Sequence, residues 1–215
     1  MNTANGENNF RGSRKSRAHN KASEPGILRS ENLGETRGFL KIKSAVDAFR
    51  YDFRNKTVLD IGSSTGGFTK LALSRGAKKV IAVEKGTNQM EAPLRFDPKI
   101  ELHEKTDIFD FKTRAADTIV ADVSFLSLTK ILKYAKLNLA RPSTDFLVML
   151  KPQFEAKPNQ LNRGVVKNES LRREILKNFE FWLKENGFLI VAKHDNTLTG
   201  RTGNRERFYY LKLAK

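Results

Sequence analysis

Residues 60–69 read Asp-Ile-Gly-Ser-Ser-Thr-Gly-Gly-Phe-Thr and continue the short apolar run that begins at Thr57. A β-branched run that leads through a glycine-rich turn into a helical pattern is typical of the first strand, turn and helix of a doubly wound α/β sheet. In such a sheet the turn lies at the carboxyl end of the strand, beside the point where ligands bind. The stretch therefore predicts the fold class and also the place of the functional site.

Short β-branched runs alternate with helical patterns along the rest of the chain. This alternation predicts βαβ units, and therefore an α/β fold with a mostly parallel sheet and helices on both faces. The last two runs are joined by a loop rich in Gly and Arg, so we expect a hairpin and an antiparallel last strand. We expect seven strands at Thr57–Ile61, Lys79–Val83, Ile100–Glu104, Thr118–Asp122, Phe146–Leu150, Phe188–Lys193 and Arg207–Leu213, and helices at Leu40–Phe49, Gly67–Ser74, Asn88–Arg95, Leu128–Ala140 and Glu169–Glu185.

The composition favours one basic globular domain. The chain has 215 residues, with 40 Lys and Arg against 24 Asp and Glu, and a formal net charge of +16. This surplus favours an anionic partner, with nucleic acid ahead of a membrane surface. The sequence contains no Cys, which excludes disulfides, thiol catalysis and Cys-ligated metals. It has no apolar run of about 18 residues, so we expect no membrane-spanning segment.

A basic, polar tail precedes the predicted domain. Residues 1–33 are rich in Asn, Ser and Gly and hold few apolar side chains. We therefore expect this tail to be disordered and the folded domain to span residues 34–215. Three interpretations of the tail stay open: a solvated leader, a basic arm that contacts RNA phosphates, and a transit peptide.

The glycine turn at residues 62–67 disfavours some ligands and favours others. Its spacing, Gly-x-x-x-Gly-Gly, differs from the Gly-x-Gly-x-x-Gly of dinucleotide-binding turns, and no P-loop Lys follows it. A pyrophosphate ligand is therefore disfavoured. The next predicted strand is followed by Glu84, where a carboxylate is placed to accept hydrogen bonds from a ribose diol. A nucleoside without pyrophosphate fits both features, and S-adenosylmethionine is the obvious one. The alternative for Glu84 is a solvated carboxylate.

Three longer motifs resemble one known family. They are residues 60–69, residues 121–128 (Ala-Asp-Val-Ser-Phe-Leu-Ser-Leu) and residues 149–155 (Met-Leu-Lys-Pro-Gln-Phe-Glu). Together they resemble the TlyA (hemolysin A) family, which belongs to the FtsJ-like ribose 2′-O-methyltransferases that act on ribosomal RNA. The resemblance runs over residues 34–213 in the family's motif order. It implies a Rossmann-like S-adenosylmethionine-dependent methyltransferase fold and a cytoplasmic enzyme that modifies ribosomal RNA or a ribosomal subunit, as in relatives that act on cytidine.

The family uses a Lys-Asp-Lys-Glu set for catalysis, and the resemblance implies that Lys41, Asp122, Lys151 and Glu206 form this set here. Methyl transfer to a ribose hydroxyl needs an aligned acceptor oxygen and a group that manages its proton. We expect Lys151 to be the base or the final positioning group and Lys41 to orient the hydroxyl or contact phosphate. The two carboxylates would hold the lysine heads. Singly, Lys41 has the alternative of a surface charge, and Glu206 that of a local ion pair with its flanking arginines.

Two further sets of residues are expected around this centre, and no metal is expected. The cofactor set is Asp60, Gly62, Ser63, Ser64, Thr65, Gly66, Gly67, Phe68, Glu84, Asp107 and Asp122, and the RNA set is Arg37, Lys157, Arg163, Arg201 and Arg205. Asp107 matches the place where related enzymes recognise the adenine amino group, although the family usually has Asn there.

Two other functions stay open from the sequence. One is a non-catalytic RNA- or ribosome-binding module on the same fold, and the other is a small-molecule methyltransferase. The complete Lys-Asp-Lys-Glu set argues against the first, and the charge surplus argues against the second. We also expect this chain to lack the family's usual N-terminal RNA-binding domain and to carry the basic tail instead.

Overall fold

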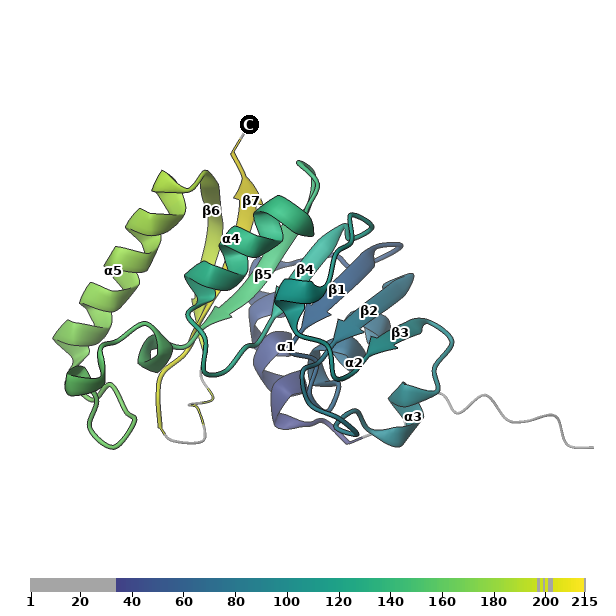
Figure 1. Ribbon diagram of the computed structural model, residues 1–215, viewed down its shortest axis with the longest axis horizontal. Helices are drawn as coiled ribbons and strands as arrows, with labels where there is room; N and C mark the ends of the chain where they lie inside the picture. Colours follow the sequence, from purple (N-terminus) through teal and green to yellow (C-terminus); the bar gives the residue numbers. More distant parts are fainter. Residues whose placement is uncertain (1–33, 197, 199, 201–202, 215) are drawn as a thin grey trace, which may run out of the picture.

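Within the described residues, seven strands form one sheet through the middle of the domain (Figure 1). The strands are β1 Thr57–Ile61, β2 Lys79–Val83, β3 Ile100–His103, β4 Thr118–Ala121, β5 Asp145–Leu150, β6 Phe188–Asp195 and β7 Arg207–Leu213. Their order is β3-β2-β1-β4-β5-β7-β6, with β1 to β5 parallel and β7 antiparallel to both of its neighbours. The sequence predicts seven strands in a mostly parallel sheet with an antiparallel last strand, and the structure confirms this; the order of the strands comes from the structure.

The computed structural model describes residues 34–196, 198, 200 and 203–214. The tail predicted over residues 1–33 and the predicted RNA contact Arg201 therefore lie outside the described residues. The helices are α1 Arg37–Phe49, α2 Gly67–Ser74, α3 Ala92–Arg95, α4 Leu128–Asn138 and α5 Glu169–Glu185, and the short 3₁₀ turns are η2 Ile108–Asp110, η3 Pro152–Phe154 and η4 Pro158–Gln160.

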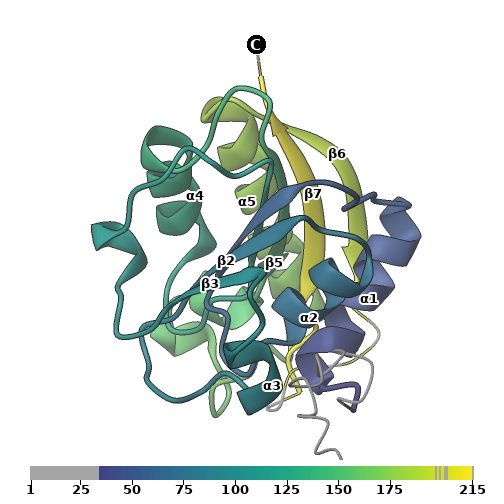
Figure 2. The same ribbon diagram turned by 90° about the vertical axis from the view of Figure 1, so that its right-hand side faces the viewer.

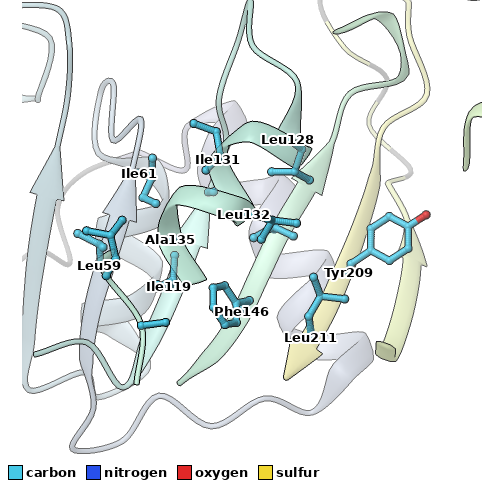
Figure 3. Close-up of a cluster of buried hydrophobic side chains, with 14 of the residues drawn as sticks. Leu59, Ile61, Ile119, Leu128, Ile131, Leu132, Ala135, Phe146, Tyr209 and Leu211 are labelled. Atoms are coloured by element: carbon cyan, nitrogen blue, oxygen red, sulfur yellow. The ribbon is translucent and has the colours of Figure 1, made fainter. Parts of the chain in front are cut away.

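Helices cover both faces of the sheet (Figure 2). An apolar layer of buried side chains lies between the helices and the sheet on each face. Successive side chains of a strand point to opposite faces, and β1 follows this rule. Leu59 packs in the layer beneath α4 and α5, which Figure 3 shows, whereas Val58 packs in the layer beneath α1 and α2. A strand that is buried on both faces is apolar along nearly its whole length, as β5 is from Phe146 to Leu150. Packing in these two layers holds the strands in place, and several of the site residues lie at or just after the carboxyl ends of these strands.

The expected helix over residues 88–95 is wrong in its first half, because α3 begins only at Ala92. Asn88 has a left-handed backbone with φ of +53°, and the amide of Gln89 donates to the Glu104 carboxylate at 3.0 Å. Pro93 lies in the first turn of α3, where a missing amide hydrogen is tolerated. The backbone before Pro93 therefore forms a hydrogen bond to the residue after β3 and does not continue a helix.

The first helix begins three residues earlier than predicted. The Thr36 side chain caps α1 by accepting a hydrogen bond from the amide of Phe39 at 3.2 Å. The helix ends where Arg50 adopts a left-handed backbone with φ of +51°. Its buried face carries Ile42 and Val46 together with one charged side chain, Lys41. The predicted strand ends Glu104 and Asp122 instead follow β3 and β4 directly.

Helices α1 and α2 approach each other most closely at Gly67, the first residue of α2. A methyl group at this position would lie 2.7 Å from the backbone nitrogen of Phe39 and 2.9 Å from the carbonyl carbon of Gly38. Both neighbours are backbone atoms of α1, so a side chain here would push the two helices apart.

Gly67→Ala is therefore expected to destabilise the protein by about 1–3 kcal/mol, the usual cost of overpacking. Gly38→Ala is the matched control, because its added methyl group would meet its nearest neighbour, the Gly67 Cα, at an ordinary 3.7 Å. Urea unfolding of both variants measures the difference. Equal stability of the two variants would contradict the close approach of α1 and α2.

Candidate active site

The carboxyl ends of β1, β4 and β5 open onto a cavity of about 760 Å³ at the lower edge of the sheet in Figure 1. The strand order reverses between β1 and β4, and ligands bind at such a switch point in open α/β sheets. The volume lies in the range of small-molecule and cofactor sites. Its lining is drawn from α1, the glycine turn, the loops after β4 and β5, and the segment before β7: Thr36, Arg37, Gly38, Lys41, Gly62, Ser63, Ser64, Thr65, Gly67, Phe68, Glu91, Asp122, Ser124, Phe125, Lys151, Gln153, Phe154, Gly164, Gly200 and Glu206.

A buried ion pair joins α1 to the segment that precedes β7. Lys41 Nζ lies 2.5 Å from Glu206 Oε2, and the two side chains are only 8% and 3% exposed. The flanking arginines have other partners, since Arg205 pairs with Glu169 at 2.8 Å and Arg207 pairs with Asp195 at 2.7 Å. Lys41 is therefore not a surface charge, and Glu206 is not paired locally.

A second ion pair joins the ends of β4 and β5. Lys151 Nζ lies 2.5 Å from Asp122 Oδ1 and also 2.9 Å from the Ser124 hydroxyl oxygen, to which it donates. Lys151 follows β5 directly, and Pro152 opens η3 immediately afterwards. All four residues of the two pairs line the same cavity. The structure thus brings together the four residues of the predicted catalytic set.

Ser124 is a site residue that the sequence did not single out. It lies in the 121–128 motif, two residues after Asp122, so its place in the chain was the available signal. Its hydroxyl gives the Lys151 head a second oxygen besides the carboxylate. The direction of the lysine side chain is therefore fixed by two contacts.

The glycine turn forms the wall of the cavity beside β1. Gly62 has a left-handed backbone with φ of +79°, and a methyl group there would lie 3.1 Å from the carbonyl oxygen of Asp122. The neighbouring Ser63 hydroxyl is buried, lines the cavity and has no hydrogen-bond partner among the described residues. A buried polar atom without a partner is costly, and a bound ligand can satisfy it. The turn therefore fits a polar, nucleoside-like cofactor that contacts its backbone closely.

Glu84 holds the glycine turn in place. Its carboxylate accepts one hydrogen bond from the amide of Ser64 at 2.9 Å and one from the amide of Gly86 at 2.7 Å. Glu84 is therefore not a carboxylate that contacts only solvent. A ribose contact by the same carboxylate stays a prediction.

Asp107 caps a 3₁₀ turn beside the site. Its carboxylate accepts a hydrogen bond from the amide of Phe109 at 3.1 Å and pairs with Lys85 at 2.8 Å. The hydrogen bond from Lys85 contributes most to holding the pKa of Asp107 below its usual range. Asp107 is not among the described residues that line the cavity, so its contact with an adenine amino group stays a prediction.

Asp60 lies beneath the turn and is fully buried. One carboxylate oxygen accepts a hydrogen bond from the Thr69 hydroxyl at 2.7 Å, and the other has no hydrogen-bond partner among the described residues. Burial raises the pKa of Asp60 to about 7, and the negative charges of Asp122 and Glu84 act in the same direction. Asp60 thus supports the turn from below as a carboxyl group that titrates near neutral pH.

The rim of the cavity carries exposed cations and one exposed aromatic ring. Of the predicted RNA contacts, Arg37 lines the cavity, whereas Arg163 and Arg205 are exposed next to the lining residues Gly164 and Glu206, and Lys157 is exposed at a separate, smaller pocket. Phe125 also lines the cavity, is 89% exposed, and its ring centroid lies 5.5 Å from that of Phe154. The sequence did not single out Phe125, because an aromatic residue after a strand end is more often buried.

The Glu residue that ends the 149–155 motif has a structural place. Glu155 accepts hydrogen bonds from the Ser127 hydroxyl and the Leu128 amide, both at 2.6 Å. Burial raises the pKa of Glu155. These bonds tie the loop after β5 to the amino end of α4.

The sheet order, the glycine turn, Asp60 near the end of β1 and the carboxylates that follow β2 and β4 define a Rossmann-like methyltransferase fold. Residues 35–213 match the model of the FtsJ-like methyltransferase family, and the chain belongs to this family. S-adenosylmethionine is the cofactor that the family uses, and the buried Ser63 hydroxyl, which has no partner among the described residues, fits it.

Three relatives are similar to this chain. The 23S rRNA (cytidine-2′-O)-methyltransferase TlyA of Campylobacter jejuni is 36% identical over 178 residues, which cover 81% of this chain and 69% of the relative. The 16S/23S rRNA (cytidine-2′-O)-methyltransferase TlyA of Mycobacterium tuberculosis is 35% identical over 191 residues, which cover 86% of this chain and 71% of the relative. A solved structure from Streptococcus thermophilus, described as a candidate hemolysin, superposes with a TM-score of 0.79 at 31% identity and covers 84% of this chain and 67% of that chain. In the described part of this chain, no helix is long and apolar enough to cross a membrane.

Asp60→Asn is expected to change how stability depends on pH. The pKa of Asp60 is about 7 in the folded protein against a reference value of 3.8, so the folded state binds more protons between these values. The contribution of Asp60 to the free energy of unfolding is fully present below about pH 4 and falls as the pH rises through 7, by up to about 4 kcal/mol.

Asn does not titrate, so the stability of the variant relative to the wild type should increase between pH 4 and pH 8. Urea unfolding of both proteins across this range measures the difference, in which the contributions of all other groups cancel. A difference that stays constant with pH would contradict the shifted pKa of Asp60.

Proposed function

We propose that this chain transfers the methyl group of S-adenosylmethionine to a ribose 2′-hydroxyl of ribosomal RNA, with cytidine as the target nucleoside. The observation that carries this proposal is the convergence of two lysine–carboxylate pairs on one cavity at the switch point of the sheet. The names of the two TlyA relatives supply the substrate class. An enzyme that acts on ribosomal RNA would work in the cytoplasm, and this is the location that we propose.

The cofactor would be held by the glycine turn and its supports. When bound, it supplies a methyl group on a positively charged sulfur, which is already activated for displacement. The backbone of residues 62–67 would face it, the Ser63 hydroxyl would gain a hydrogen-bond partner, and Glu84 would hold the turn and reach the ribose diol. Asp60 would fix the same turn from beneath through Thr69.

Each of the two ion pairs would have a separate role toward the ribose that accepts the methyl group. Lys151 Nζ would contact the 2′-oxygen and, when uncharged, take the hydroxyl proton, while Asp122 and Ser124 hold the lysine head. Lys41, held by Glu206, would orient the ribose or its neighbouring phosphate. In-line displacement depends on this alignment, since a small misplacement of the acceptor oxygen costs rate steeply.

The exposed cations at the rim would bind the RNA backbone. Arg37 lines the cavity, Arg163 and Arg205 are exposed beside lining residues, and Lys157 and Arg201 belong to the same proposed set from the sequence. The net charge of +16 supports a polyanionic substrate over a small neutral one. A ribosomal subunit or free ribosomal RNA presents the same phosphate chemistry to this rim.

Lys151→Ala is expected to lower the rate of methyl transfer by about 10²–10⁴-fold, because it removes the group that manages the proton. The assay follows methyl-labelled S-adenosylmethionine into ribosomal RNA or subunits from cells that lack the enzyme. Lys79→Ala is the matched control: Lys79 also forms a 2.5 Å ion pair, with Glu101, but at the opposite end of the strands.

Near-normal turnover by a folded Lys151→Ala protein would overturn the proposed role of Lys151. Cofactor binding without transfer by the wild type to any ribosomal RNA would favour another acceptor. RNA binding without cofactor binding by the wild type would favour a non-catalytic RNA-binding module.

Removing rim charges is expected to weaken the salt dependence of RNA binding. The affinity for RNA falls as salt rises, so the slope of log K against log salt is negative. Lys157→Ala and Arg163→Ala should each make this slope less steep by about one, since each removes one phosphate contact. Arg54→Ala is the control, because Arg54 is exposed in the loop before β1, at the other edge of the sheet, and pairs with Asp52. Filter binding at several salt concentrations measures the slopes. Equal slopes in all three variants would place the RNA elsewhere.

A further inference from the structure

A short hairpin projects over the cavity from the loop after β5. The backbones of Asn162 and Val165 pair through two hydrogen bonds of 2.9 and 3.0 Å. The two residues between them, Arg163 and Gly164, have left-handed backbones with φ of +49° and +79°. Two successive positive φ values are the mark of a type I′ turn. The turn therefore presents the exposed Arg163 side chain at its tip, while Gly164 lines the cavity.

One buried side chain outside the predicted catalytic set forms two hydrogen bonds to the backbone of this hairpin and its next residue. Asn204 is 1% exposed, and its side-chain amide donates to the carbonyl oxygen of Gly164 at 3.0 Å. Its side-chain oxygen accepts a hydrogen bond from the amide of Val166 at 2.9 Å. The same amide group thus bonds to the turn and to the strand that leaves it, which fixes the hairpin in both position and orientation.

Asn204 is itself held in a rigid frame that also carries Glu206. The carbonyl oxygen of Asn204 accepts a hydrogen bond from the amide of Gly200 at 2.7 Å, and the carbonyl oxygen of Glu206 accepts one from the amide of Asn196 at 3.0 Å. Between them, the buried Arg172 side chain of α5 donates to the carbonyl oxygen of Arg205 at 3.2 Å. The backbone of residues 204–206 is therefore bound at every residue.

We propose that Asn204 is a positioning residue that holds the 162–165 hairpin over the cavity mouth and ties it to the segment before β7 that bears Glu206. Arg163 and the Lys41–Glu206 pair are then set by one frame, so the RNA contact and the catalytic contact keep a fixed separation. The RNA part of this inference rests on the proposed function, since it takes Arg163 to contact a phosphate. The clamp itself does not depend on that function.

Hydrogen–deuterium exchange tests the clamp without any activity. In Asn204→Ala, exchange of the amides in residues 161–167 should rise at least about tenfold, because both side-chain bonds to the hairpin are lost. Asn196→Ala is the matched control. It is also a buried Asn, 5% exposed, and its side-chain oxygen accepts from the Leu198 amide within its own loop.

Unchanged exchange in Asn204→Ala, or an equal rise in Asn196→Ala, would overturn the clamp. If Asn204→Ala does not fold, Asn204→Asp serves instead. It keeps an oxygen for the Val166 amide but removes the donor to Gly164, and an intermediate rise in exchange is expected. Exchange equal to wild type in that variant would count against the clamp.

A double-mutant cycle tests the positioning role in the reaction. Asn204→Ala should raise the KM for RNA several-fold while the Kd for S-adenosylmethionine stays unchanged, because the cofactor turn lies on other elements. Arg163→Ala should raise the KM in the wild-type background and have little further effect in the Asn204→Ala background.

Additive effects of the two substitutions would contradict the proposal, since they would mean that Arg163 keeps its place without Asn204. Absence of methyl transfer by the wild type would overturn the proposed function, and with it the RNA part of the inference. The exchange measurement would still decide the clamp on its own.

Discussion

The site depends on a buried ion pair between Lys41 on α1 and Glu206 before β7, two segments at opposite ends of the domain's sequence. Taking two charges out of water is expensive, and the cost is offset only when each charge finds the other in good geometry. The 2.5 Å separation and the near-complete burial of both side chains meet that condition. Neither partner can be removed alone without leaving a buried charge unpaired, so the pair constrains where α1 and β7 lie relative to each other.

The rest of the site follows from the topology of the sheet. Because β1, β4 and β5 are parallel neighbours, their carboxyl ends lie along one edge and bring the glycine turn, Asp122 and Lys151 to the same cavity. The antiparallel β7 enters the sheet beside β5, so Glu206, the residue just before β7, lies at the same edge. One antiparallel strand thus completes a site that parallel strands alone would leave without its fourth residue.

The sequence predicted the strands well because apolar runs of strand length are local patterns. The four residues that the resemblance implied for catalysis do line one cavity, and their catalytic roles stay a proposal. It predicted a full helix over residues 88–95 wrongly, since the Gln89 amide is used by Glu104 of another segment. Asn204 was missed as a site residue for a similar reason. Its partners Gly164 and Val166 lie about forty residues away, and no spacing rule connects them. For Asp107, the pairing with Lys85 depends on a tertiary contact that no motif encodes.

The central claim is that the four-residue site modifies a ribose hydroxyl and not a base. Its most direct test is to methylate ribosomal RNA with labelled S-adenosylmethionine and digest the product, both to nucleosides and with alkali. We predict that the label appears in 2′-O-methylcytidine and that the bond following that nucleotide resists alkaline cleavage, because cleavage needs a free 2′-hydroxyl. Label recovered in a base-methylated nucleoside, with normal alkaline cleavage at that position, would contradict the account.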